Sequence, residues 1–186
     1  LNNKFRYSIL TPYFENPDFK KSFRHILKYN TKEYKKLHKF LVKNSNGVIS
    51  SDVDYHIPYI KEDKYLGLIP NPINIDKIKY KKIESIDKIK ILHGINSKNY
   101  IKKGNIFFDK ALKVIENKYQ DKVEIIRTID LEYIEYTKAV ENCHILLDQV
   151  YAYDQGYNAL EAMAIGKTVF TGAEKEWLEL YHIQEN

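Results

Sequence analysis

The chain has 186 residues, of which 44% are hydrophobic and 30% charged, the balance of a folded globular protein with room for one domain or slightly more. Its single cysteine excludes a disulfide framework and a multi-cysteine zinc site, and no apolar run reaches the ~18–20 residues that span a membrane. The net charge of +5 comes from dispersed lysines without a nucleic-acid-binding motif, so we expect no nucleic-acid partner.

The first residues, Leu1 to Arg6, contain neither an initiator methionine nor the apolar core of a signal peptide, which indicates a fragment or a processed chain. Apolar spacing, capping residues and turn residues then predict the elements of the first 72 residues. They are a helix over 19–29, a helix between Thr31 as its N-cap and Asn46-Gly47, a strand over 48–50, a short helix capped by Ser51 or Asp52, and a strand over 65–69 that ends at Pro70-Asn71-Pro72.

Residues 73–87 are rich in lysine and lack a clean period, which predicts an exposed connection between two domains. Beyond it, strands and helices alternate with short connections. The predicted strands cover 89–93, 123–126, 144–148 and 168–170, and the helices cover 105–119, 131–142 (capped by Asp130), 157–165 (ended by Gly166) and a segment around Trp177. This alternation predicts an α/β fold with a Rossmann-like, doubly wound parallel sheet, of which about six strands are usual and four are visible.

Three loops follow predicted strands and therefore meet at the carboxyl edge of the sheet, where such folds bind ligands. The loop over 93–104 carries Lys98, Lys102 and Lys103 ahead of a helix, so a phosphate bound there would meet ammonium groups and the positive end of the helix dipole. The loop over 149–158 leads into a helix that carries Glu161, a carboxylate suited to accept hydrogen bonds from sugar hydroxyls or to stabilise the helix start. The loop over 171–174 is either a ligand loop or a helix start capped by Thr171.

Residues 157–169, Tyr-Asn-Ala-Leu-Glu-Ala-Met-Ala-Ile-Gly-Lys-Thr-Val, resemble the hallmark of bacterial-type GT-B glycosyltransferases, a glutamate followed by Ala-Met-Ala and a Gly-Lys-Pro-Val turn into a strand. Lys102-Lys103-Gly104 is similar to the Lys-Gly element of the same enzymes, and Ile69-Pro70-Asn71 is similar to the turn that ends their acceptor domain. The resemblance implies an incomplete donor-binding domain over 88–186, a connection over 73–87, and the C-terminal part of an acceptor domain over 1–72.

The resemblance also implies roles for individual residues. Lys98 and Lys103 would neutralise the donor diphosphate and act in catalysis without a metal or another cofactor, and Glu161 would hold the ribose. The remaining residues that we expect to bind the donor are His93, Asp154, Gly156, Tyr157 and Asn158. Three positions depart from the family pattern: Tyr153 replaces a glutamate, with Asp154 one residue out of register, Lys98 replaces an arginine, and Thr168 replaces a proline.

The function implied is transfer of a sugar from a UDP- or GDP-sugar to a glycan or lipid-linked acceptor in cell-surface polysaccharide synthesis. It implies a cytoplasmic protein, with peripheral association at the inner face of the membrane as one option, and weak activity for this fragment alone. Two alternatives share the fold: a sugar-nucleotide epimerase and a non-catalytic nucleotide-binding module. A response-regulator-like domain would need acidic residues where the strand 89–93 ends, and this chain has His93-Gly94 there.

Overall fold

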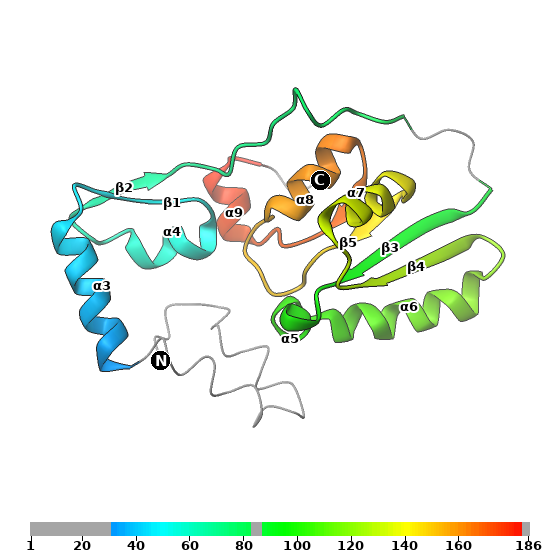
Figure 1. Cartoon of the computed structure of the whole chain (residues 1–186), viewed down its shortest axis with the longest axis horizontal. Helices are drawn as coiled ribbons and strands as arrows, with labels where there is room; N and C mark the ends of the chain where they lie inside the picture. The colour runs from blue at the N-terminus through cyan, green and yellow to red at the C-terminus, as the bar shows by residue number, and fades with distance from the viewer. Residues whose placement is uncertain (1–30, 83–86, 184–186) are drawn as a thin grey trace.

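The computed structural model describes residues 31–82 and 87–183, and it contains two parallel sheets with helices packed against them (Figure 1). The predicted helix over 19–29 lies outside the described residues. Within the described ranges, no helix is both long and apolar enough to cross a membrane.

The first unit is a short βαβ arrangement preceded by a helix. Its elements are α3 (Lys32–Asn44), β1 (Val48–Ser50), α4 (Val53–Tyr59) and β2 (Tyr65–Leu68). The predicted cap is confirmed, because the Thr31 side chain accepts a hydrogen bond from the amide of Tyr34. The two strands pair in parallel, as a helical crossover between them requires.

The second unit is an α/β domain built on a four-stranded sheet in the order β4-β3-β5-β6, with every pair parallel. In chain order its elements are β3 (Ile89–Ile95), the 3-10 turn η2 (Ser97–Asn99), α5 (Tyr100–Lys103), α6 (Asn105–Tyr119), β4 (Val123–Ile129), α7 (Tyr133–Asn142), β5 (Ile145–Leu147), α8 (Tyr157–Ile165), β6 (Thr168–Phe170) and α9 (Lys175–Leu180). The Rossmann-like α/β fold predicted from the alternation of strands and helices is confirmed.

Successive side chains of a strand point to opposite faces of the sheet, and here both faces carry apolar side chains. Helices therefore cover both faces. On one face Ile91 and Leu147 pack against Leu112 of α6. On the other face Leu92 and Leu146 pack beneath α7 and α8, together with Val140, Cys143, Ala162 and Ile165. Figure 1 shows α6 on the opposite side of the strands from α7 and α8.

The chain reverses its direction across the sheet at β3. It runs from β3 outward to β4, then returns to place β5 on the other side of β3, and continues to β6. This reversal leaves a crevice beyond the carboxyl ends of β3 and β5, the position at which open α/β sheets bind their ligands. A ligand site is therefore expected among the segments that follow these strands.

Two strands are longer than predicted, and one helix begins later. β3 continues to Ile95 and β4 to Ile129, where seven residues of each pair in register. The predicted cap Asp130 is wrong: its backbone has a φ of 51°, its carboxylate accepts the amide of Ser97 at 2.8 Å, and α7 begins at Tyr133 with Glu132 as its N-cap. A capping aspartate typically has an extended backbone and a carboxylate that accepts an amide of the helix, and Asp130 has neither, so α7 begins two residues beyond the predicted start.

The segment before β3 is more closely attached than an exposed connection would be. Ile78 packs against the core beneath α7 and α8, and the amide of Lys81 donates to the carbonyl of Ile165 at 2.9 Å. Lys81 also pairs with Glu141 at the end of α7. Most side chains of this segment are nonetheless exposed, as its lysine content predicts.

Candidate functional site

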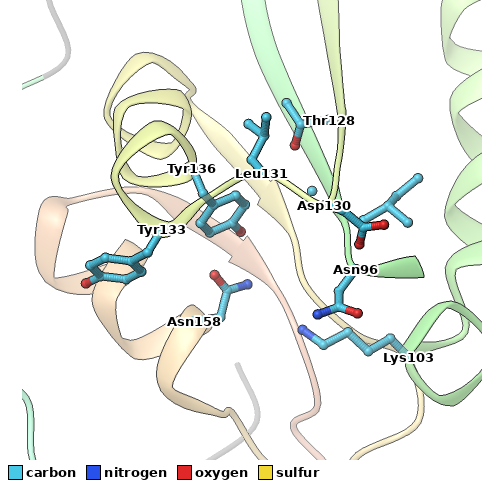
Figure 2. A pocket seen from close by; sticks show the side chains of 10 residues that line it. Asn96, Lys103, Thr128, Asp130, Leu131, Tyr133, Tyr136 and Asn158 are labelled. Carbon is cyan, nitrogen blue, oxygen red and sulfur yellow. The ribbon is translucent and has the colours of Figure 1, made fainter. Parts of the chain in front are cut away.

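A polar cavity of about 280 Å³ lies at the carboxyl edge of the four-stranded sheet, beside the reversal at β3 (Figure 2). Its walls come from the ends of β3 and β4, from the end of α5 and from the first turns of α7 and α8. The lining residues are Gly94, Ile95, Asn96, Lys103, Thr128, Asp130, Leu131, Tyr133, Tyr136 and Asn158. The cavity therefore combines a cation and amide groups on one side with aromatic and aliphatic surface on the other.

A buried carboxylate organises the cation side. Asp148 follows β5 and is 2% exposed, and its Oδ1 accepts the Lys103 ammonium and the Asn158 amide, each at 2.7 Å. Its Oδ2 accepts the Thr171 hydroxyl at 3.1 Å. A buried carboxylate is stable only when it is paired and hydrogen-bonded, so these contacts fix Lys103 and Asn158 at the wall of the cavity.

Two tyrosines of α7 form the opposite wall. The Tyr133 hydroxyl donates to Glu161 Oε1 at 3.1 Å, and this hydrogen bond raises the pKa of Tyr133. Burial raises the pKa of Tyr136, whose hydroxyl also interacts with Asn158. Both phenols thus stay protonated and can donate. Glu161 contacts Tyr133 but is not itself a lining residue of the cavity.

The loop after β3 and the loop after β4 are tied together at the mouth. Asp130 accepts the Ser97 amide, and its pKa is lowered by hydrogen bonds from Ser97 and by the charge of Lys98. Asn96 accepts the Lys98 amide at 3.0 Å, which starts the 3-10 turn. An ionised carboxylate therefore stands at the rim, well placed to accept hydrogen bonds.

The structure brings together some of the residues that the sequence singles out. Lys103 and Asn158 line the cavity and share Asp148, whereas Glu161 contacts the lining residue Tyr133 without lining the cavity itself. Gly156 is the N-cap of α8, and Tyr157 is the exposed first residue of that helix. Thr171 caps no helix: it binds Asp148, and α9 begins after Glu174.

Lys98 and His93 lie elsewhere. The exposed Lys98 is next to the mouth but is absent from the lining of the cavity in the described part of the chain. His93 does not face a cleft, because β3 continues beyond it and α6 covers it completely. Its Nε2 is hydrogen-bonded to Asn105 at 2.9 Å, and its Nδ1 is 3.3 Å from Asp109, to which Tyr100 also donates.

Asp154 also differs from its predicted place, since it joins the two units instead of lining the cavity. It is 5% exposed and accepts the amide of the buried Val53 at 2.8 Å, which ties the start of α4 to the loop before α8. Oxygens of Asp52, Asp54 and Asp154 lie within 4.8 Å of one another, a spacing at which carboxylates can share a proton or a cation. Burial, with the charges of the two other carboxylates, raises the pKa of Asp154 to about 7.

The sequence did not point to eight of the lining residues as ligand contacts: Gly94, Ile95, Asn96, Thr128, Asp130, Leu131, Tyr133 and Tyr136. All of them lie at the ends of β3 and β4, just beyond these ends, or in the first turn of α7. The available signal was the rule that ligands meet residues just beyond the carboxyl ends of strands. Thr128 was missed because β4 was predicted to end at Ile126. Asp130, Leu131, Tyr133 and Tyr136 were missed because they were assigned to the cap and the first turns of a helix.

No family model, no curated protein and no solved structure matches this chain. The fold and the cavity themselves define its class, a Rossmann-like α/β domain with a mixed polar and aromatic cavity at the carboxyl edge of its parallel sheet.

Proposed function

We propose that this chain is the donor-binding part of a GT-B-type glycosyltransferase, which transfers a sugar from a UDP- or GDP-sugar to a glycan or lipid-linked acceptor. One observation carries the proposal. Lys103 of the Lys-Gly element and Asn158 of the hallmark segment are far apart in sequence, yet both line one cavity beside the strand-order reversal. Glu161 of the hallmark segment is hydrogen-bonded to Tyr133, another residue of that lining. The reversal is the point at which α/β folds bind nucleotides.

The cation side of the cavity suits a diphosphate. The Lys103 ammonium has three donors, of which Asp148 takes one, so two remain for phosphate oxygens. α8 begins beside this group at Tyr157, and its uncapped N-terminus adds backbone amides and a positive dipole. As the bond from sugar to phosphate breaks, negative charge grows on the leaving diphosphate, and preorganised donors of this kind stabilise it.

The aromatic side suits a nucleoside. Glu161 accepts a hydrogen bond from Tyr133 and can accept the ribose hydroxyls in the same way. Leu131 and Tyr136 offer apolar surface to a planar base, and Asp130 offers an acceptor at the rim. The acceptor sugar or lipid then approaches from the open side, where proximity to the donor supplies much of the rate enhancement.

The test is thermal stabilisation by UDP, GDP, ADP and CMP, measured on the wild-type chain and on Glu161→Gln. A nucleotide at 100 times its Kd stabilises the folded state by about 2.7 kcal/mol, which a melting curve resolves readily. We expect one diphosphate to raise the melting temperature and Glu161→Gln to abolish most of that shift. Glu135→Gln, an exposed acid on α7, is the matched control and should leave the shift unchanged.

A melting temperature that responds to no nucleotide, in a sample with native circular dichroism, would contradict the proposal. A shift that survives in Glu161→Gln would reject the assigned ribose site. Release of UDP or GDP from the sugar nucleotide in the presence of an acceptor glycan would support the transferase activity. A shift without any such release, even with acceptor glycans present, would favour the non-catalytic nucleotide-binding module over the transferase.

A further inference from the structure

The helix α3 has a composition and an exposure that the proposed donor site does not explain. It carries five lysines against one acid, Glu33, in 13 residues. None of its residues is buried, and its large apolar side chains are half exposed or more: Leu37 50%, Phe40 62% and Leu41 56%. Scattered exposed leucines are ordinary on a folded protein, but a cluster of them on one helix marks an interaction surface.

The two kinds of side chain are sorted around the helix. Side chains three and four residues apart lie on the same face of a helix, so Leu37 and Leu41 form one row. Lys36, Phe40 and Lys43 form the adjacent row by the same spacing. An apolar strip thus runs along α3 with lysines at its border, and their long aliphatic stems can extend past it while the ammonium groups stay in water.

α3 is attached to the rest of the described chain in a way that leaves this strip open. Among the contacts that hold it, His38 meets the Tyr59 hydroxyl at 3.3 Å, and Lys64 donates to the carbonyls of Val42 and Lys43 at the C-terminal end of the helix. His38 and Val42 lie on a different side of the helix from Leu37 and Phe40. Figure 1 shows α3 at the outer end of the molecule, far from the four-stranded sheet.

We propose that α3 binds the surface of a lipid bilayer that contains anionic phospholipids, with Leu37, Phe40 and Leu41 inserted among the acyl chains. The charge argues for this partner over an apolar protein groove. A helix that presents a strip of leucine and phenylalanine bordered by lysines lies flat in the interface, where the lysines meet lipid phosphates. This inference does not depend on the proposed transferase activity, because no residue of α3 belongs to the cavity.

The experiment is co-sedimentation of the full chain with vesicles of phosphatidylcholine, with and without phosphatidylglycerol. We expect binding to the anionic vesicles and little binding to the neutral ones, with a marked loss as salt is raised. Leu37→Ser/Leu41→Ser should weaken binding at least about tenfold by removing inserted apolar area. Lys36→Gln/Lys43→Gln should weaken it about 25-fold, since each lysine near an anionic surface contributes roughly a factor of five.

Matched controls lie on α6, the long helix of the other unit. Val114 is 63% exposed, and Lys110 and Lys113 are exposed lysines, so Val114→Ser and Lys110→Gln/Lys113→Gln change similar groups at a different place. Both should bind vesicles like the wild-type chain. All variants change exposed residues, and circular dichroism verifies that each retains its helix content.

Three outcomes would overturn the proposal. The first is no binding to anionic vesicles. The second is vesicle binding that weakens equally with the lysine changes on α3 and on α6, or that is unchanged in Leu37→Ser/Leu41→Ser. Either result would show general charge attraction. The third is a dimer in sedimentation velocity that Leu37→Ser/Leu41→Ser converts to a monomer without affecting vesicle binding, which would assign the strip to a second copy of the chain.

Discussion

Replacing Lys103 by methionine isolates the contribution of the cation that the cavity shares with Asp148. Methionine keeps much of the length and apolar stem of the side chain but removes the ammonium group. Asp148, 2% exposed, would then retain only Asn158 and Thr171 as partners. Breaking a buried ion pair by removing one partner costs about 3–5 kcal/mol, and because the Lys103 side chain is 25% exposed we expect about 2–3 kcal/mol.

That loss should lower the melting temperature by about 4–12 °C in a chain of this size. The assay is urea unfolding followed by circular dichroism, with Lys113→Met, an exposed lysine of α6, as a control that should stay within about 0.5 kcal/mol of wild type. Adding Asp148→Asn to Lys103→Met removes the unpaired charge and should recover part of the stability. A loss below about 1 kcal/mol, or strictly additive effects of the two changes, would refute the view that Asp148 depends on Lys103.

Three further predictions concern the rest of the fold. The raised pKa of Asp154, about 7, means that the folded protein retains a proton that the unfolded chain has released, so the Asp154 contribution should lower the melting temperature as pH rises from about 4 to about 7, and Asp154→Asn should remove this contribution; an Asn variant with the same pH profile as wild type would contradict the assignment. Gly166→Ala should cost about 1–3 kcal/mol in urea unfolding, because Gly166 has a φ of 98° and a Cβ there would lie 2.5 Å from the Tyr80 ring; an unchanged midpoint would show that the segment before β3 does not pack there. Leu112→Ala should cost about 2–5 kcal/mol, since Leu112 is fully buried beneath the sheet, whereas Val114→Ala on the exposed side of α6 should change little.

The regular parts of the fold were predictable from sequence because each rests on a local rule. Periodic apolar residues identified α6, the alternation with strands identified the parallel sheet, and Gly166 marked the end of α8 through its left-handed backbone. The extension of β3 and β4 was not predictable in this way. Those residues pair across the sheet, and a pairing partner is a tertiary contact that a local pattern does not contain.

The candidate site likewise contains residues that were predictable from local sequence and residues that were not. Lys103, Asn158 and Glu161 were identifiable as polar residues near predicted strand ends or in the hallmark segment. The topology of the sheet brought Lys103 and Asn158 into one cavity and Glu161 into contact with its lining residue Tyr133. His93 could not be placed correctly, because its burial depends on where α6 crosses the strand. Asp154 follows a strand as ligand-binding residues do, but the docking of α4 against it decided its neighbours.

By itself, the sequence determined the order and type of the elements, the α/β class, and the residues that could carry charge at a sheet edge. Each of these depends on side chains close together along the chain. The tertiary structure decided which of those residues share a cavity, which are buried away from it, and which join the two units. These outcomes depend on the order of strands and the docking of helices, where residues such as Lys103 and Asp148, 45 positions apart, come within 2.7 Å.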